Sequence, residues 1–323
     1  MNPKFFWKLA PVLGLKGITH ESSLLFGLNK LKFLSKSILY DIVSIYKSLK
    51  FADTIIILGV SGCIFLPLVK FFGKSQLIVN IDGLEWKRQK WRGFAKQFLK
   101  FSERLAVKFS SVVVADNEAI AKHVQSNYNA VCKTIAYGGD HACVDHKEKL
   151  MVDIPFKVEG YAFALCRIEP ENNVHLILEA FASASMNLIF VGNWQASDYG
   201  CELIDRYSSI ANMKLLDPIY DLDVLAMYRR NCRVYIHGHS AGGTNPSLVE
   251  MMHFEKPIIA FDCVYNRATM EDKGQYFSSS SSLSKSIKTP ECFEEGKELG
   301  DIARRRYTWS VVRAQYHKLF DFK

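Results

Sequence analysis

The sequence lacks several patterns that mark whole classes of protein. It has no run of about 18 apolar residues, so we expect no membrane-spanning helix. Its first residues, "MNPKFFWKLAPVLGLKG", are short on apolar length and have no small-residue cleavage site, which argues against a signal peptide. The eight cysteines are scattered from Cys63 to Cys292, with no C-x-x-C spacing and no paired histidine cluster. This scatter predicts reduced thiols in a cytoplasmic protein, not a zinc site or a disulfide framework.

Two chemical signatures are also missing. A nicotinamide-dependent dehydrogenase needs a G-x-G-x-x-G turn with an acid about 20 residues later, and the sequence has no such pair. No Asp-x-Asp stands at a predicted strand end, and the "DLD" at 221–223 has the pattern of a helix cap. We therefore expect neither a metal ion nor a cofactor.

The positive charge is concentrated in the first part of the chain. The formal net charge is +8, and residues 1–140 hold 20 Lys and Arg against 9 Asp and Glu, whereas the remainder holds 21 against 24. This asymmetry fits a solvated surface, or a surface that lies on an anionic leaflet or a lipid diphosphate. Nucleic acid is a third interpretation, but no binding motif accompanies the charge. The first two interpretations stay open.

Short β-rich apolar runs alternate with longer amphipathic ones, which predicts parallel sheets wound by helices. One series of buried strands is expected at 54–60, 76–81 and 111–116, and a second at 161–166, 186–192, 233–238 and 257–262. Helices are expected at 62–73, 90–110, 172–184, 202–211, 222–231 and 245–254, with a terminal helix or helix pair over 302–322. The fold class is therefore α/β with two Rossmann-like domains. We place them at 1–150 and 151–305, followed by a helix at 306–323 that crosses back to the first domain.

The stretch "HGHSAGGTNPSLVEMMHF", residues 237–254, is the strongest candidate site. It predicts a glycine-rich turn and then a helix with Asn245 as cap and Pro246 as first residue. Such a turn aims backbone N–H groups and a partial positive charge at one spot, which suits phosphate. Glu250, about one turn inside an apolar helix, is costly unless it finds partners. Sugar hydroxyls are one possibility, and a neighbouring backbone amide is the other.

Three further loops of the second domain, each next to a predicted strand or helix, are candidates for ligand contacts. Arg167 in "CRIEPENN" matches the geometry of a diphosphate, although a lone arginine more often forms a surface salt bridge. Gly192 and Asn193 follow a strand and are placed to approach a ligand. Ile219 and Tyr220 precede a capped helix and suit contact with a flat base, although a tyrosine in a turn is more often structural.

In the first domain, "VNIDGLEWKRQKW" continues past a strand end. Asp82 and Glu85 are candidate contacts for the hydroxyls of a substrate, and Lys87 with Arg88 would serve an anionic group. A capped helix start explains the same residues equally well. The turn "AYGGDHA" has a similar composition, and we expect it at the mouth of the cleft.

These blocks carry a family resemblance. "VNIDGLEWKRQKW", "CRIEPENN", "HGHSAGGTNPSLVEMM" and "KPIIAFDCVYNRATMED" resemble the retaining glycosyltransferases of the GT-B fold, family 4. They are most similar to the bacterial rhamnosyltransferase-like branch, whose N-terminal domain is known as DUF1972. The resemblance covers roughly residues 37–321.

The resemblance implies a nucleotide-sugar donor held mostly by the second domain. Glu250 matches the second acid of the family's E-x7-E motif, which commonly binds the ribose, and Asp82 falls where many relatives have a sugar-contacting histidine. The resemblance also implies that the diphosphate of the donor contacts Arg167 and the backbone amides of Gly243, Thr244 and Asn245. The base of the nucleotide would contact Ile219 and Tyr220.

The sequence departs from the family pattern at three places. The first acid of E-x7-E is Gly242, so we assign the donor-sugar contact to His239. Asn172 and Asn173 replace a lysine, which leaves Arg167 and the helix dipole to neutralise the diphosphate. The first domain is expected to lack the opening strand and glycine-rich loop of its relatives.

The resemblance therefore implies transfer of a sugar, with rhamnose as the expected sugar, to a glycan or lipid-linked acceptor in cell-surface polysaccharide synthesis. Configuration would be retained, without a protein nucleophile. We expect a cytoplasmic protein with peripheral contact to the inner face of an anionic membrane, and no nucleic-acid partner. The alternatives are a shortened, inactive homologue that only binds nucleotide or glycan, and a GT-B nucleotide-sugar epimerase.

Overall fold

The computed structural model describes residues 33–88, 91–143, 154–158, 160–288 and 293–320. The chain divides into two units, residues 1–136 together with 312–323, and residues 137–311. The division between Ala136 and Tyr137 precedes the boundary that we predicted near residue 150, which itself lies outside the described residues. The predicted loss of an opening strand falls on residues before 33 and is likewise outside them.

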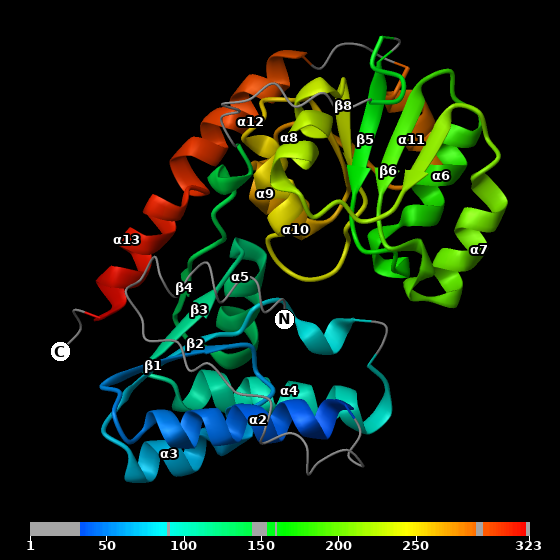
Figure 1. Ribbon diagram of the computed structural model, residues 1–323. Coiled ribbons are helices and arrows are strands. Elements are labelled where there is room, and N and C mark those ends of the chain that lie inside the picture. The colour runs from blue at the N-terminus through cyan, green and yellow to red at the C-terminus, as the bar shows by residue number, and fades with distance from the viewer. Residues whose placement is uncertain (1–32, 89–90, 144–153, 159, 289–292, 321–323) are drawn as a thin grey trace. The chain divides into compact units, whose positions relative to one another are not determined.

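The first unit contains a four-stranded parallel sheet in the order β1-β2-β3-β4 (Figure 1). Its strands are β1 (Thr54–Leu58), β2 (Gln76–Asn80), β3 (Val112–Ala115) and β4 (Cys132–Thr134). Its helices are α2 (Phe33–Ser48), η2 (Cys63–Phe65), α3 (Leu66–Phe72), η3 (Glu85–Lys87), α4 (Gly93–Phe109) and α5 (Glu118–Tyr128). The predicted strands at 54–60, 76–81 and 111–116 are confirmed, each one to two residues shorter than expected.

The terminal stretch forms two helices, α12 (Phe293–Arg306) and α13 (Trp309–Phe320). From Val312 onward α13 belongs to the first unit. There Asn80 Nδ2 donates to Tyr316 Oη at 3.0 Å and Gln76 Nε2 donates to the carbonyl of Leu319 at 2.9 Å. The first bond gives the buried Asn80 amide a partner, and both bonds attach α13 to β2.

The second unit contains a six-stranded parallel sheet in the order β10-β9-β8-β5-β6-β7. Its strands are β5 (Tyr161–Leu165), β6 (Asn187–Val191), β7 (Met213–Leu216), β8 (Val234–His237), β9 (Ile258–Phe261) and β10 (Gln275–Phe277). The outermost two, β7 and β10, were not predicted, because three or four partly exposed residues at a sheet edge give no clear apolar run.

Helices cover both faces of this sheet. One face carries α6 (Val174–Ala182), α7 (Asp198–Tyr207) and α11 (Ser280–Ser286), and the other carries α8 (Leu222–Asn231), α9 (Pro246–Met252) and α10 (Val264–Met270) (Figure 1). The winding direction reverses between β5 and β8, which are neighbours in the sheet. In doubly wound folds the ligand lies at this reversal, beside the carboxyl ends of the strands. The loops after β5 and β8 are therefore the first place to look for a site.

Candidate functional site

The loops after β5 and β8 are bonded to each other across the reversal point. The Nδ1 of His239 lies 2.7 Å from Oδ1 of Asn172, and Asn173 Nδ2 donates to the carbonyl of Gly238 at 2.9 Å. The backbone N–H of Ser240 donates to the carbonyl of Glu171 at 3.0 Å. Because Asn172 Oδ1 only accepts, the facing Nδ1 of His239 carries a proton. Asn172 and Asn173 thus bond the loop after β5 to the loop after β8.

The helix start predicted after the β8 loop is confirmed. Asn245 is the N-cap of α9, its Oδ1 accepting from Ser247 N at 3.0 Å and from Ser247 Oγ at 2.8 Å, and Pro246 is the first helical residue. Gly242 has φ of 121°, a left-handed conformation that disfavours any side chain. A glutamate held in this backbone conformation would be strained, whereas glycine adopts it freely.

The Glu250 carboxylate is held by two side chains of the same unit. Oε2 accepts from Nη2 of Arg229 and Oε1 accepts from Nε2 of His141 at 3.2 Å. Burial raises the pKa of Glu250, but the hydrogen bond from His141 and the charge of Arg229 outweigh it and hold the pKa below its usual range. The acid on the apolar helix is therefore ionised and already partnered by protein.

Arg229 was missed by the sequence analysis. Arg229 lies on the buried face of α8, together with Leu225, Ala226 and Tyr228, and is only 1% exposed. The spacing of three to four residues could have indicated a buried Arg229 from the sequence, because it places the arginine on the apolar stripe of the helix. A buried guanidinium requires an acid, and Glu250 supplies it.

His141 was also missed, although its "AYGGDHA" turn was noted. It lies in η4 (Asp140–Ala142), directly after Gly138 and Gly139. A Cβ atom on Gly139 would lie 2.7 Å from the backbone of Val249 and Glu250, so glycine permits the close approach of this turn to α9. Trp309 Nε1 donates to Nδ1 of His141 at 3.0 Å. Since Nδ1 accepts, Nε2 carries the proton that is donated to Glu250.

The other predicted donor contacts lie in loops at the carboxyl edge of this sheet. The Arg167 side chain is 63% exposed and pairs with Glu169 at 3.4 Å. Gly192 packs its backbone against Ile168, since a Cβ there would lie 2.4 Å from that side chain. The remaining positions are the exposed Asn193 before η6 (Trp194–Ala196), the partly exposed Ile219 and the exposed Tyr220 before α8, and the buried Gly243 and Thr244.

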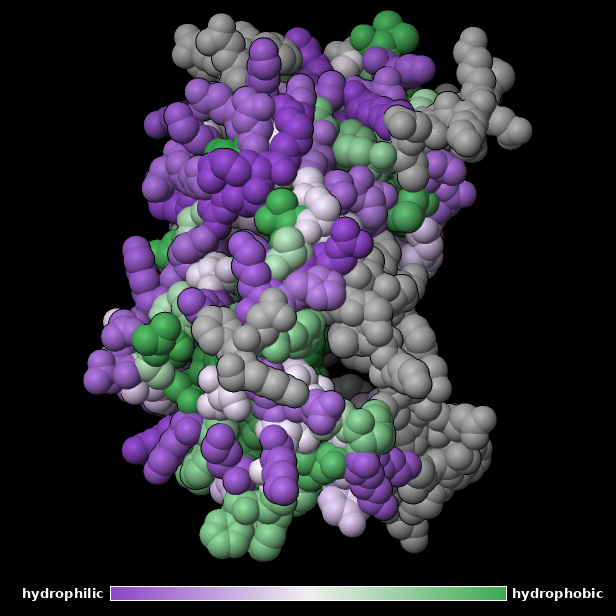
Figure 2. Space-filling view, turned by 90° about the vertical axis from the view of Figure 1, so that its left-hand side faces the viewer, coloured by the Kyte–Doolittle hydropathy of each residue, from purple (hydrophilic) through white to green (hydrophobic). Residues whose placement is uncertain are grey.

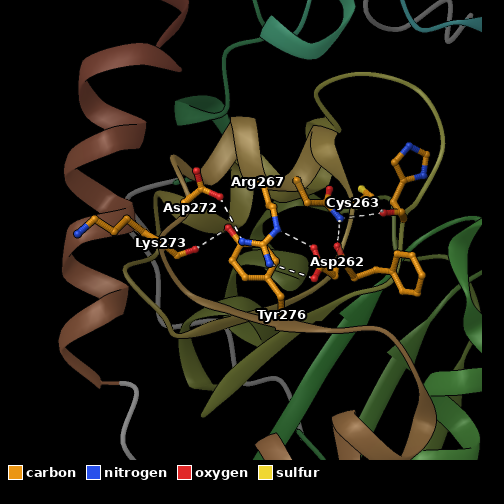
Figure 3. Close-up of polar contacts among 9 residues, drawn as sticks. Asp262, Cys263, Arg267, Asp272, Lys273 and Tyr276 are labelled. Atoms are coloured by element: carbon orange, nitrogen blue, oxygen red, sulfur yellow. Dashed lines mark hydrogen bonds and ion pairs between the residues drawn. The ribbon is translucent and has the colours of Figure 1, made fainter.

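The loop after β9 is stabilised by Arg267, shown in Figure 3. Its Nε and Nη2 donate to the two oxygens of Asp262 at 2.6 and 3.0 Å, and its Nη1 donates to Asp272 at 3.2 Å. The guanidinium lies 4.2 Å from the ring centroid of Tyr276. The hydrogen bond from Arg267 lowers the pKa of Asp262. Asn266, on the same helix, donates to the carbonyl of His239 at 2.8 Å, so this loop supports the loop after β8.

Asp82 and the predicted acceptor-side residues Glu85, Lys87 and Arg88 belong to the first unit. Asp82 has φ of 56°, an uncommon conformation for a residue with a side chain, and its N–H bonds Asn80 Oδ1 at 2.9 Å. Glu85 accepts from Trp91 Nε1 at 2.9 Å and from Arg88 at 3.4 Å. Lys87 Nζ lies over the ring of the neighbouring Trp86, so Lys87, like Glu85 and Arg88, makes local contacts.

Two family models match parts of this chain. Residues 24–140 match the domain of unknown function DUF1972, and residues 147–288 match the model described as glycosyl transferases group 1. No curated protein matches the chain. Its fold is shared with solved GT-B structures. The chain is a GT-B glycosyltransferase.

Three structures illustrate the fold likeness of this glycosyltransferase. Sucrose-phosphate synthase from Thermosynechococcus elongatus has a TM-score of 0.73 at 12% identity, covering 89% of this chain and 78% of its own. Anabaena HepE in complex with UDP has a TM-score of 0.67 at 17% identity, with coverages of 86% and 81%. The pneumococcal O-GlcNAc transferase GtfA in complex with UDP and GlcNAc has a TM-score of 0.62 at 12% identity, with coverages of 85% and 58%.

The described residues of the glycosyltransferase contain neither a cluster of metal ligands nor a membrane-spanning helix. Within the ranges given above, no three His, Cys, Asp or Glu side chains lie together as metal ligands would. The same ranges contain no helix that is both long and apolar enough to span a membrane. The expectation that no metal or cofactor takes part stays a prediction.

Proposed function

We propose that this glycosyltransferase binds a nucleoside-diphosphate sugar at the β5–β8 reversal and transfers the sugar to a hydroxyl of a glycan or lipid-linked acceptor. The observation that carries the proposal is the ionised Glu250 on α9, the helix that follows the β8 loop, together with the bonds that join this loop to the loop after β5. The ligands of similar folds support a nucleotide donor, since HepE was solved with UDP and with UDP-glucose.

Glu250 accepts hydrogen bonds from the ribose hydroxyls in this proposal. Each carboxylate oxygen has two lone pairs, so Glu250 can keep its bonds from Arg229 and His141 while it accepts others. Its low pKa keeps it an acceptor at neutral pH. Ile219 and the exposed Tyr220 flank the base, with the apolar ring surface that base stacking requires.

Arg167 and the amides of Gly243, Thr244 and Asn245 bind the diphosphate. The guanidinium is exposed and its ion pair with Glu169 is worth little, so it is available to a phosphate. Negative charge grows on the leaving diphosphate in the transition state, and these donors stabilise it. His239, Gly192 and Asn193 contact the donor sugar. Asp82 takes the place of the sugar-contacting histidine of many relatives, and Glu85, Lys87 and Arg88 serve the acceptor side.

The reaction retains the configuration of the sugar, by front-face attack with the leaving phosphate as base and no protein nucleophile. We propose dTDP-rhamnose as donor and cell-surface polysaccharide as product, on the resemblance of the sequence blocks to the rhamnosyltransferase-like branch of family 4. UDP-sugars are the second candidate donors, because two of the similar structures named above, HepE and GtfA, were solved with UDP.

A donor screen tests this function. The purified chain is mixed with dTDP-rhamnose, UDP-glucose or UDP-GlcNAc and with glycan or lipid-linked acceptors, and released nucleotide is measured together with the product's anomeric configuration. Release of one nucleotide with a retained product supports the proposal. Nucleotide binding by calorimetry without turnover of any donor would replace it with the binding-only alternative. Absence of nucleotide binding would remove the site as well.

A further inference from the structure

The end of α2, the turn after it and α3 expose an unusual number of large apolar side chains. Phe71 and Phe72, at the end of α3, are 82% and 78% exposed, and Phe51 in the turn is 65% exposed. Tyr46 and Leu68 are more than half exposed as well. α3 already buries Leu66 and Val69 in the core, so it is apolar on both faces. Apolar side chains gathered in this way on a surface mark an interaction site.

These side chains border one depression. A cavity of about 740 Å³ is lined by residues of all three segments, among them Tyr46, Phe51, Leu68 and Phe72. In Figure 2 hydrophobic side chains gather at the lower end of the face shown, with hydrophilic ones beside them. We name Tyr46, Phe51, Leu68, Phe71 and Phe72, with the lysines described next, the aromatic–basic surface.

Four exposed lysines accompany the apolar side chains. Lys47 and Lys50 follow Tyr46, and Lys70 and Lys74 flank the Phe71–Phe72 pair. Lys50 Nζ lies 5.4 Å from the centroid of the Tyr46 ring. Asp53 is the single acid between residues 42 and 81. The surface therefore combines apolar groups with a net positive charge.

The neighbouring helix α4, which packs against α3, extends the positive charge. Lys96, Lys100, Arg104 and Lys108 are all exposed and recur every fourth residue, which places them along one side of the helix. Glu103, the single acid of α4, is buried and accepts from Trp86 and Tyr128, so it does not offset the stripe at the surface.

We propose that the aromatic–basic surface binds the headgroup region of an anionic phospholipid bilayer. Aromatic rings and leucines enter the boundary between headgroups and acyl chains, while lysines extend their stems along the apolar groups and reach anionic headgroups. Each lysine near such a surface contributes its own electrostatic attraction, and the contributions of neighbouring lysines add to the free energy of binding. This binding needs neither donor nor acceptor, so it stands or falls independently of the proposed reaction.

The charge of the surface disfavours a second copy of the chain as its occupant. A two-fold symmetric contact places the same patch on both partners. The four lysines of one copy would then face the four lysines of the other, with Asp53 as the one acid that each copy contributes from residues 42–81. An anionic bilayer supplies the missing negative charge over the whole patch.

Vesicle sedimentation tests the proposal with the full chain. The vesicles consist of phosphatidylcholine alone or with about 30% phosphatidylglycerol, and salt is raised from about 0.05 to about 0.5 M. We expect binding to the anionic vesicles only, with a loss of about tenfold or more at high salt. Equal binding to both vesicle types, or binding to neither, would overturn the proposal.

Two double variants separate the two parts of the surface. Phe71→Ser with Phe72→Ser and Lys70→Glu with Lys74→Glu should each reduce vesicle binding by about tenfold or more. Because all four side chains are exposed, folding should persist, which circular dichroism checks. Lys214→Glu with Lys288→Glu, a matched charge change at exposed positions of the second unit, should leave binding unchanged. An equal loss of vesicle binding in this control would contradict the assignment. So would a dimer in solution that Phe71→Ser with Phe72→Ser dissociates.

Discussion

His141 donates from Nε2 to Oε1 of Glu250 over 3.2 Å, and Trp309 fixes the tautomer that makes this possible. A turn near the start of the second unit and a residue near its end thus orient one acid in the middle of it. Arg229 completes the arrangement from α8. Glu250 is ionised and aligned before any ligand arrives, which lowers the ordering cost of binding.

Glu250→Gln should weaken binding of the donor nucleotide by more than about 1 kcal/mol, because a charge-assisted hydrogen bond to the ribose becomes a neutral one. Calorimetry with dTDP and UDP measures the change. Glu202→Gln, at an exposed position of α7, is the matched control and should bind as the unchanged chain does. Unaltered affinity in Glu250→Gln would remove the ribose assignment.

Arg229→Met should destabilise the second unit by about 3–5 kcal/mol, since it leaves the Glu250 charge without its buried partner. Urea unfolding measures the loss. The double variant Arg229→Met, Glu250→Gln should recover part of it, because the uncompensated charge is then gone. Arg206→Met, at an exposed position of α7, should change stability by no more than about 0.5 kcal/mol. If Arg229→Met lowered the free energy of unfolding by no more than Arg206→Met does, the ion pair would not stabilise the fold.

Stability should fall with acid through the titration of Glu250. Its pKa is lowered in the folded state, so the folded chain favours the carboxylate more than the unfolded chain does. The contribution is therefore complete above the ordinary pKa of about 4.5 and is lost as the pH falls through the lower, folded value. Urea midpoints between about pH 6 and pH 3 should decline less steeply in Glu250→Gln than in the unchanged chain. Parallel declines would contradict the shift.

Arg167→Ala should reduce kcat more than it reduces nucleotide affinity, because the charge on the diphosphate grows in the transition state. Steady-state kinetics and calorimetry on the same preparation separate the two effects. Arg233→Ala, at an exposed position before β8, is the control and should match the unchanged chain in both. Equal losses of kcat and affinity in Arg167→Ala would assign it to ground-state binding instead.

Much of the fold was predictable because it depends on local patterns. The buried runs of β5, β6, β8 and β9 are short, apolar and bounded by polar turns, so their existence and order could be read directly. The start of α9 was predicted to the residue, since Asn245 and Pro246 have capping and first-turn preferences that act locally. Edge strands such as β10 were missed because partial exposure removes their apolar signal.

The partners of Glu250 could not be predicted in the same way. His141 and Arg229 lie 109 and 21 positions away in the chain, as their shared numbering shows, and no local pattern links them to α9. The Gly138–Gly139 pair was predicted to be a turn. That Gly139 lets the turn approach the backbone of α9 depends on where α9 lies, which the sequence does not show.

The sequence by itself determined the order of strands and helices, the capped start of α9 and the presence of an acid that required partners. These follow from preferences that act over a few residues. Only the tertiary structure decided that the acid pairs with Arg229 and His141, and that the phenylalanines ending α3 stay exposed among lysines. Both depend on which surfaces the winding of the chain brings together. A buried charge needs a partner, which the sequence far away must supply, whereas an aromatic ring stays exposed where no other element covers it.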